Sequence, residues 1–322
     1  MKRILLTAAL LAGSLSLSAQ CGWDGYEVKT ENSYTHYSVR YSSNPKDAMR
    51  YDTRRLRGEF LIEKVMVPGE VHWTYTTIDR FLVGGAMPTT SPLALTSIAP
   101  LYVDLSKSDN GRRLLDNREL GIINVGGDGC VTVDGKRFDL AFQEALYVGK
   151  GAKEIVVESK DAQTPAKFYM NSACAHESHP TKKVGLKDAK NIEAGSAAES
   201  NARVIHQVIL NGVAGVRTCQ LQMGITELQT GSVWNTMPAH THLKRMEAYF
   251  YYNVPEGQKV CHIMGEPQET RLLWTGNEQA VISPEWSIHC AAGTASYTFI
   301  WGMAGENLIY NDMQVVKIPD LE

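Results

Sequence analysis

The sequence has no Cys-x-x-Cys pair, although it contains six cysteines. They are scattered along the chain, at positions 21, 130, 174, 219, 261 and 290. Zinc ribbons and redox-active dithiols need cysteines that are close together in the sequence, so this spacing excludes both kinds of site. Scattered cysteines in a chain of 322 residues are typical of buried apolar positions, and we predict no particular disulfide.

The chain also lacks an excess of charge of one sign. Its 32 Lys and Arg residues stand against 35 Asp and Glu residues, which gives a formal net charge of −3. Proteins that bind nucleic acids concentrate basic side chains on one face or along one element, and no such concentration is visible here. We therefore expect no nucleic-acid partner.

No apolar run in the N-terminal region is long enough to span a membrane. Residues 4–17 are mostly apolar but are interrupted by Thr, Gly and Ser, whereas a spanning helix needs about 20 apolar residues. Lys2 and Arg3 precede this run, and Ser18 and Ala19 follow it. This layout is typical of a secretory signal peptide over residues 1–19, cleaved after Ala19, and predicts export to the periplasm.

Two alternatives concern the same N-terminal region. Cys21 would suit lipidation, but Gln20 occupies the position where a small residue is expected before a lipidated cysteine. An unprocessed or misassigned N-terminus is the other alternative, because Met49 also offers a start.

Sustained helical periodicity is scarce, and short strands separated by turn residues prevail. The clearest turn is Asp134-Gly135, which follows a β-favouring run and predicts a hairpin. Strands are predicted over residues 60–67, 120–125, 130–133, 146–148, 154–158, 203–210, 219–228, 248–254, 259–264, 279–283 and 296–301. Such close spacing predicts an all-β fold, a sandwich or barrel, with few short helices.

The domain organisation is predicted from a change in composition at residues 182–201. This stretch is rich in Ala, Gly, Lys and Glu and is low in hydrophobicity, so it is predicted as a linker. An N-terminal segment (20–44) and a β-domain without a metal motif (45–181) would precede it. A C-terminal metal-binding domain (202–322) would follow it.

The chemistry of the chain is concentrated in the segment that begins with His240 and His242. Residues two apart on a strand point to the same face, so these two imidazoles are presented together. Glu247 follows five positions later, and a turn around residues 243–245 would return its carboxylate to the imidazoles. His289, at the end of a strand-like run after Pro284, is the fourth candidate ligand.

Three imidazoles and one carboxylate suit a borderline divalent cation, namely Zn²⁺, Fe²⁺, Mn²⁺, Ni²⁺ or Co²⁺. Such a set leaves a position for water or substrate if the metal is five- or six-coordinate. An open position is typical of a catalytic metal site.

The pattern His-x-His, four residues, Glu, followed by Pro-x-x-x-x-His, resembles the two cupin motifs. Gly231 lies further from His240 than in the common pattern, and Trp286 stands where many cupins have glycine. The wider sequence resembles the family of 5-keto-4-deoxyuronate isomerases, also called 4-deoxy-L-threo-5-hexosulose-uronate ketol-isomerases. This second resemblance rests on the blocks IDR (78–80), VGGAMP (83–88), RELGIIN (118–124), EALYVGKGAKE (144–154), PTKKV (180–184), WNTMP (234–238), GEPQETR (265–271), NEQAVISP (277–284) and YTFIWGM (297–303).

The resemblance implies a duplicated cupin, with two β-barrel or jelly-roll domains, that forms a homohexamer. It implies one Zn²⁺ per subunit on His240, His242, Glu247 and His289. It also implies conversion of 5-dehydro-4-deoxy-D-glucuronate into 3-deoxy-D-glycero-2,5-hexodiulosonate during pectin degradation. Members of the family are usually cytoplasmic, which is the alternative to export.

The substrate implied by the resemblance is a carboxylate, which a bidentate arginine suits. Arg245, inside the metal motif, and Arg271 are the candidate substrate-binding residues, with Lys182 as a third. Their alternative role is ordinary surface charge.

Isomerisation also needs a base within hydrogen-bond reach of the substrate. Glu247 is a poor base while it binds a metal, so the candidates are His176, Tyr252 and Glu269. The sequence leaves open whether the hydrogen moves as a proton through an enediol or as a hydride between the adjacent carbons. Two other functions remain open: a ferrous cupin dioxygenase and a non-catalytic, metal-dependent binding protein for sugar acids.

Overall fold

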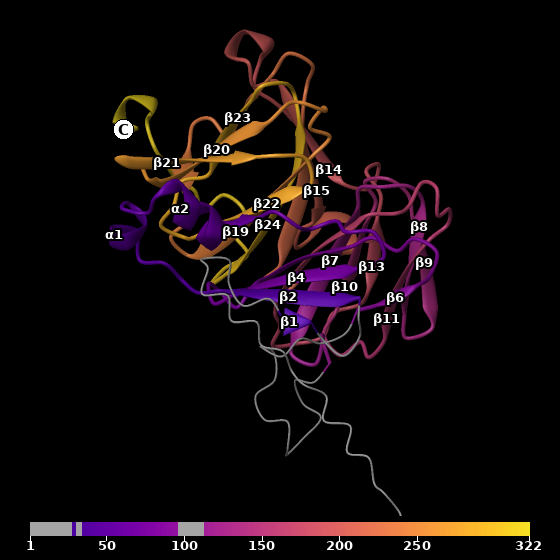
Figure 1. Cartoon of the computed structure of the whole chain (residues 1–322). Helices are drawn as coiled ribbons and strands as arrows, with labels where there is room; N and C mark the ends of the chain where they lie inside the picture. The colour runs from indigo at the N-terminus through magenta and orange to yellow at the C-terminus, as the bar shows by residue number, and fades with distance from the viewer. Residues whose placement is uncertain (1–27, 30–33, 96–112) are drawn as a thin grey trace, which may run out of the picture.

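A computed structural model describes residues 28–29, 34–95 and 113–322 (Figure 1). The predicted signal peptide and most of the predicted 20–44 segment before residue 34 lie outside these residues. Among them, no helix combines the length and the apolar character needed to cross a membrane. The five cysteines within them, at positions 130, 174, 219, 261 and 290, are free.

The N-terminal half consists of a large and a small sheet. The large sheet has the strand order β1 (Val28–Lys29), β2 (Thr35–Arg40), β4 (Val71–Thr76), β5 (Leu82–Ala86), β12 (Phe168–Cys174), β7 (Arg118–Asn124), β10 (Ala145–Val148) and β13 (Lys182–Val184). The small sheet has the order β6 (Leu93–Ala94), β11 (Ile155–Ser159), β8 (Gly129–Val133) and β9 (Lys136–Leu140). Buried residues such as Trp73, Leu146 and Phe168 form the apolar core of this half.

The C-terminal half repeats this plan. Its large sheet has the order β14 (Lys190–Ala194), β15 (Arg203–Ile209), β16 (Gln222–Leu228), β24 (Thr298–Gly305), β19 (Arg245–Tyr252), β22 (Gln279–Ser283) and β3 (Leu61–Ile62). Its small sheet has the order β17 (Trp234–Asn235), β23 (Cys290–Gly293), β20 (Val260–Glu266) and β21 (Glu269–Thr275). The remaining elements are the pair β18 (His240–Thr241) and β25 (Gln314–Val315), and the 3₁₀ turns η2 (Ala197–Glu199), η3 (Val213–Gly215) and η4 (Ile318–Asp320).

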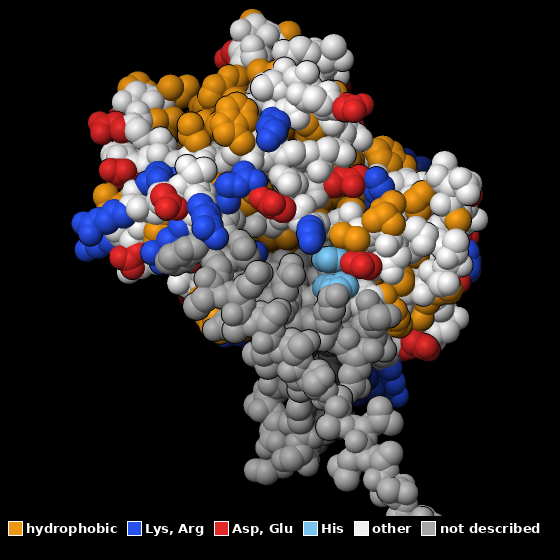
Figure 2. Space-filling model, in the orientation of Figure 1, with side chains coloured by type: hydrophobic (Ala, Val, Ile, Leu, Met, Phe, Trp, Pro, Cys, Tyr) orange, Lys and Arg blue, Asp and Glu red, His pale blue; other side chains and the backbone are white. Residues whose placement is uncertain are grey.

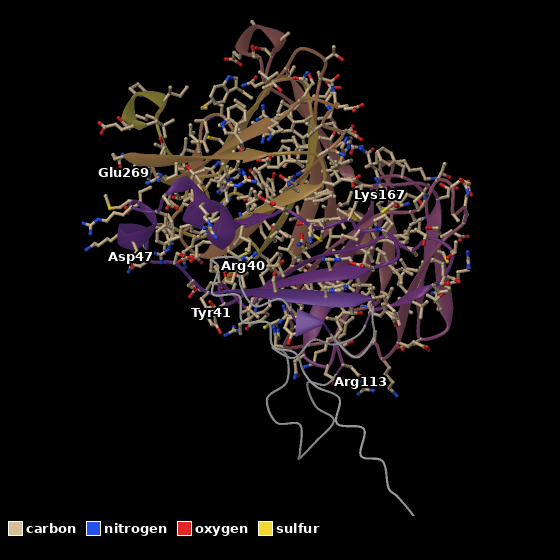
Figure 3. The ribbon with its side chains drawn as sticks, viewed as in Figure 1. Arg40, Tyr41, Asp47, Arg113, Lys167 and Glu269 are labelled. Atoms are coloured by element: carbon tan, nitrogen blue, oxygen red, sulfur yellow. The ribbon has the colours of Figure 1, made fainter. Side chains whose placement is uncertain are left out.

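The two large sheets face each other where the halves meet. Tyr169 of β12 stacks on Phe250 of β19 with their ring centroids 4.4 Å apart. A side chain at Gly121 of β7 would collide with the sulfur of Met223 in β16, because an added Cβ would lie 2.3 Å from it. An ion pair between Lys167 (Figure 3) and Glu278, 2.5 Å long, also joins the two halves. The sheets therefore form one continuous core rather than two separate bodies.

The prediction of an all-β, duplicated fold with few short helices is confirmed. The predicted hairpin is also confirmed, because β8 and β9 pair on either side of Asp134-Gly135. The surface in Figure 2 carries acidic and basic side chains interspersed, as the balanced composition indicates.

The predicted strand over residues 60–67 is wrong over most of its length. An α-helix, α2 (Thr53–Phe60), ends at Phe60, and only β3 follows it. The Asp52 side chain accepts a hydrogen bond of 2.8 Å from the backbone N–H of Arg55 and so caps the helix. Leu56 and Phe60, four residues apart, form its buried face, so capping and packing together favour a helix here.

The predicted start of the N-terminal domain at residue 45 also needs correction. The short helix α1 (Pro45–Ala48) and α2 pack on the C-terminal half, and β3 pairs with β22 in its large sheet. Leu61 and Ile62 point to opposite faces of β3 and are both buried, which suits an edge strand that other elements cover on both faces. After β2, the next strand along the chain that belongs to the N-terminal large sheet is therefore β4.

The predicted linker at 182–201 contains two strands. β13 closes the edge of the N-terminal large sheet, and β14 forms the edge of the C-terminal one. The chain crosses from one sheet to the other between residues 184 and 190. The low hydrophobicity of this segment reflects exposed edge strands, which favour polar and charged residues.

A buried carboxylate connects the two halves. Glu119 of β7 is fully buried and accepts hydrogen bonds of 2.7–2.8 Å from the backbone N–H groups of Cys219, Gln220 and Leu221. The hydroxyl of Tyr147 donates a fourth hydrogen bond, 2.8 Å long, to the same carboxylate. The carboxylate thereby fixes the entry to β16 against the N-terminal sheet.

We predict that Glu119→Gln lowers the free energy of unfolding by about 2–3 kcal/mol, because an NH₂ group would replace one acceptor that faces only donors. Chemical denaturation monitored by fluorescence measures this effect. Glu193→Gln, at an exposed position in β14, is the matched control and should leave the midpoint unchanged. Equal midpoints for both variants would contradict a stabilising role for Glu119.

Candidate metal centre

Four side chains from three separated segments meet in the C-terminal half. His240 lies on β18, and His242 follows it directly. A turn, in which the N–H of Arg245 bonds the carbonyl of His242 at 3.3 Å, then leads into β19, which carries Glu247. His289 immediately precedes β23. The predicted turn around residues 243–245 therefore returns Glu247 to the two histidines.

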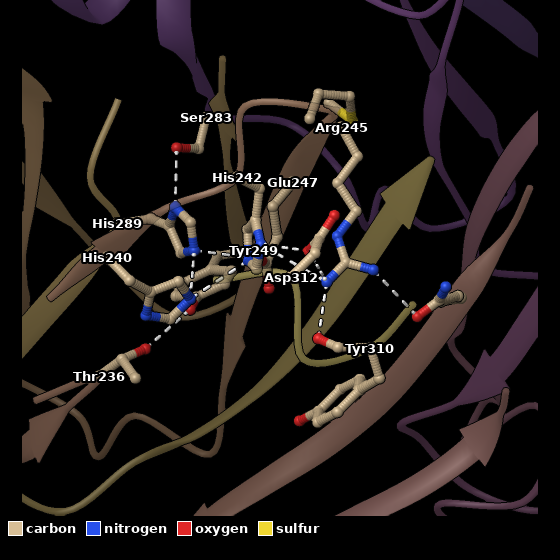
Figure 4. Close-up of polar contacts among 12 residues, drawn as sticks. Thr236, His240, His242, Arg245, Glu247, Tyr249, Ser283, His289, Tyr310 and Asp312 are labelled. Atoms are coloured by element: carbon tan, nitrogen blue, oxygen red, sulfur yellow. Dashed lines mark hydrogen bonds and ion pairs between the residues drawn. The ribbon is translucent and has the colours of Figure 1, made fainter. Parts of the chain in front are cut away.

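The ligand atoms of this group converge on one point (Figure 4). The Nε2 atom of His240 lies 3.2 Å from Nε2 of His242 and 3.1 Å from Nε2 of His289. Oε2 of Glu247 lies 3.3 Å from Nε2 of His242 and 3.0 Å from Nε2 of His289. Zinc bonds of about 2.0–2.2 Å in a tetrahedron separate ligand atoms by roughly 3.4 Å, so these distances fit a single small cation.

The protonation states also fit a cation. Burial, reinforced by the imidazoles of His289 and His242, lowers the pKa of His240 to about 2, so this ring is neutral near pH 7. Burial raises the pKa of Glu247, but the neighbouring His289 and His242 outweigh it and hold the pKa below its ordinary value. Neutral imidazoles and an ionised carboxylate are the forms that bind a metal.

The other ring nitrogens of these histidines face polar groups that orient them. Nδ1 of His242 lies 3.0 Å from Oδ1 of Asp312, and Nδ1 of His289 lies 3.4 Å from the hydroxyl of Ser283. His240 bonds the backbone of Pro238. With protons on Nδ1, the three Nε2 lone pairs and the Glu247 carboxylate point at one another, which is repulsive unless a cation lies between them.

Arg245, a candidate for substrate binding, has a different position. Its side chain is almost fully buried, and Nη2 lies 2.7 Å from Oδ1 of Asp312 and 2.7 Å from the carbonyl oxygen of Tyr310. Nη1 bonds the side chain of Gln222 at 3.3 Å. Arg245 thus holds Asp312 in place against His242 and does not line the cavity beside the metal ligands.

The other sequence candidates do not meet at this centre. Arg271 donates to the backbone carbonyls of Met49 and Tyr51 and so anchors the segment between the two helices. Lys182 is exposed on β13, and the side chain of His176 is exposed at the end of the N-terminal half.

The two remaining candidate bases also lie elsewhere. The hydroxyl of Tyr252 accepts a hydrogen bond from Gln143 of the N-terminal half at 3.1 Å. Glu269 is exposed at the start of β21, at the outer edge of the molecule in Figure 3. Neither residue lines the cavity at the candidate metal centre.

A cavity of about 290 Å³ is lined by three of the four candidate ligands, His240, His242 and Glu247. Alternate residues of the large sheet face into it, including Tyr249 of β19, Phe299 and Trp301 of β24, and Arg203 and Ile205 of β15. The segment around Tyr310 forms the opposite wall. Arg203, Tyr249, Tyr310 and Asp312 were not among the sequence candidates, and the one sequence signal was the alternation of Arg203 and Ile205 at the start of a predicted strand.

A second group of candidate ligands lies in the N-terminal half. His36 of β2 and His72 of β4 are register neighbours with their rings stacked 4.9 Å apart. Both imidazoles face the Glu70 carboxylate, at 3.4 Å and 2.6 Å. This group has three ligands, is partly exposed and lies outside the cavity.

Comparison with known proteins matches the chain along most of its length. A model of the KduI/IolB family matches residues 87–318. The 4-deoxy-L-threo-5-hexosulose-uronate ketol-isomerase of Formosa agariphila is 56% identical over 287 residues, which cover 89% of this chain and 99% of the relative.

The chain belongs to the KduI/IolB family.

Further relatives agree with this assignment. A 4-deoxy-L-threo-5-hexosulose-uronate ketol-isomerase of Bacteroides thetaiotaomicron is 52% identical over 89% of the chain and 99% of its own length. The ketol-isomerase of that name from Salmonella typhi is 50% identical over 88% of the chain and 99% of its own length. The predicted family is confirmed, and the chain is an enzyme of the ketol-isomerase class.

Among solved structures, an IolB-like protein from Salmonella typhimurium superposes with a TM-score of 0.58 at 15% sequence identity. The match covers 73% of this chain and 86% of that protein. At this identity the likeness concerns the fold alone.

Proposed function

We propose that this protein is a metal-dependent isomerase that converts 5-dehydro-4-deoxy-D-glucuronate into 3-deoxy-D-glycero-2,5-hexodiulosonate. The observation that carries the proposal is the convergence of His240, His242, Glu247 and His289, three of which, His240, His242 and Glu247, line a cavity. The names of the relatives, which are ketol-isomerases of a hexosulose-uronate, support the substrate class.

A divalent ion bound by these four residues would supply Lewis-acid polarisation of the substrate carbonyl, which acidifies the neighbouring C–H. The chain itself would hold the sugar acid in the cavity. The apolar wall formed by Ile205, Phe299 and Trp301 excludes water from the reacting carbons, and water exclusion strengthens electrostatic interactions within a site.

We propose that Tyr249 donates a hydrogen bond or transfers a proton at the carbonyl end of the substrate. Its hydroxyl lies 3.1 Å from the hydroxyl of Thr236 and in the same cavity wall as Glu247. Burial, followed by the Glu247 carboxylate, raises the pKa of Tyr249 well above its usual range, so the hydroxyl remains protonated near pH 7. A neutral phenol there can donate a hydrogen bond to a substrate oxygen.

We propose zinc as the resident ion, because three imidazoles and one carboxylate suit it and leave room for substrate; other divalent metals bind the same ligand types. We also propose a homohexamer, a role in pectin degradation, and export of the mature chain to the periplasm. Export follows from the predicted leader alone, and the alternative location is the cytoplasm.

The test is a turnover assay with the purified chain and the unsaturated uronate released by a pectate lyase digest. NMR should show the aldose signals replaced by those of the ketose, and a chelator should lower the rate by at least about 10³-fold, since the metal supplies several kcal/mol of stabilisation. Bound metal without isomerisation would overturn the proposal. Oxygen consumption would then indicate a dioxygenase, and substrate binding without turnover would indicate a binding protein.

A further inference from the structure

Arg203, on β15, is a cationic residue that lines the cavity beside the candidate metal ligands. It is the first residue of β15, and the next residue on the same face of that strand, Ile205, also lines the cavity. Glu247 and Tyr249 line the cavity from β19, which is separated from β15 by β16 and β24. One face of a single sheet therefore carries a metal ligand and an arginine.

The guanidinium of Arg203 is partly buried but forms few hydrogen bonds. Nη1 donates to the carbonyl oxygen of Asn201 at 2.9 Å. Nε is buried and has no hydrogen-bond partner among the described residues. Among the described residues this side chain forms no ion pair, and the groups whose charges influence it are Tyr249, Tyr310, Tyr297 and Glu199.

Arg203 is partly buried, and the two fully buried arginines differ from it in their partners. Arg245 has the carboxylate of Asp312 at 2.7 Å, and Arg118 donates to the hydroxyl and carbonyl of Ser172 and to the carbonyl of Arg80. A guanidinium that is partly removed from water without a counter-ion carries a free-energy cost, and an anion bound beside it would offset that cost. Burial lowers the pKa of Arg203, which reflects the same unfavourable environment for its charge.

The surroundings of Arg203 determine which anion fits. The cavity wall next to it is apolar, with Ile192, Ile205 and Phe299, and the hydroxyls of Tyr249 and Tyr310 add hydrogen-bonding groups. A planar guanidinium that is free on its Nε side presents two parallel donors, which match a carboxylate. The metal-binding residues occupy a separate part of the same cavity, so one bound sugar acid can contact both the metal and Arg203.

We propose that Arg203 is the specificity-determining residue that binds the carboxylate of a sugar acid while its carbonyl end lies at the four metal ligands. This inference rests on the proposed function and names the subsite that distinguishes acidic from neutral sugars. Arg245 and Arg271 do not line the cavity, and their terminal guanidinium nitrogens are bound to Asp312 and to backbone carbonyls.

The test compares equilibrium binding of D-galacturonate and D-galactose to the metal-loaded protein by calorimetry. The two probes differ only in having a carboxylate or a hydroxymethyl group. The unaltered protein should prefer galacturonate, and Arg203→Met should weaken its binding at least about 30-fold while galactose binding stays the same. Arg203→Lys should retain part of the preference, and in turnover assays Arg203→Met should raise KM more than it lowers kcat.

Arg217→Met, at an exposed position of the same half, is the matched control and should behave like the unaltered protein. Unchanged metal content in Arg203→Met shows that the centre is intact. A preference for galacturonate that survives in Arg203→Met, or is absent from the unaltered protein, overturns the subsite. If the preference depends on Arg203 but no isomerisation occurs, the subsite stands and the proposed reaction fails.

Discussion

Replacing His242 with alanine is expected to remove most of the bound metal and to lower kcat/KM by at least about 10³-fold. His242 supplies one of four converging ligand atoms and lies 3.2 Å and 3.3 Å from two of the others. Its loss would also leave Asp312 without the imidazole that it orients. Elemental analysis and the turnover assay measure the two effects on the same preparation.

The fold should survive this substitution, because His242 follows the short strand β18 and is not part of the cores between the sheets. His176→Ala, whose side chain is exposed in the N-terminal half, is the matched control and should keep both metal and activity. If His242→Ala retained full metal content and turnover, the four residues would not be the functional centre.

Replacing Asp312 with alanine is expected to reduce metal affinity about 10- to 100-fold, since groups that orient metal ligands have effects of this size. The same change should lower the free energy of unfolding by about 3–5 kcal/mol, because it leaves the buried guanidinium of Arg245 without its carboxylate. Competition with a fluorescent chelator measures the affinity, and chemical denaturation of the metal-free protein measures the stability.

A double substitution separates these two effects. Asp312→Ala combined with Arg245→Met removes the unpaired charge and should recover stability, whereas metal affinity should stay low. Asp320→Ala, an exposed aspartate near the C-terminus, is the control. Asp312→Ala with normal metal affinity would show that Asp312 does not orient His242.

The convergence of His240, His242 and Glu247 could be predicted from the sequence because their spacing is local. His240 and His242 are separated by one residue, and a short turn connects them to Glu247. His289 is distant in sequence, and the pairing of β23 with β20 and β17, strands that the sequence analysis did not all predict, brings it to the other three residues. The strands themselves were predictable from turn residues, as at Asp134-Gly135.

The helix α2 was not predicted, because its last residue, Phe60, was assigned to the start of a strand. A helix is distinguished from a strand here by the N-cap that Asp52 provides and by the burial of Leu56. Both features depend on packing against the C-terminal half. The domain boundary was misplaced for the same reason. Pairing between β3 and β22 joins residues more than 200 positions apart, which no local pattern reveals.

The arginine that we propose for substrate binding could not be predicted from proximity to the motif. Arg245 lies inside the motif, but Asp312, 67 residues later, occupies its guanidinium. Arg203 lies 37 residues before His240, and only the shape of the cavity brings them to the same site. Which arginine is free for a ligand is a property of the folded contacts, not of sequence spacing.

The central claim is that catalysis depends on one metal ion held by His240, His242, Glu247 and His289. Its most direct test is stepwise addition of Zn²⁺ to the metal-free protein, with bound metal and isomerase rate measured at each step. We predict that the rate rises in proportion to the bound metal and reaches its maximum at one equivalent per chain. Full activity in the metal-free protein, or no activity after one equivalent has bound, would contradict the claim.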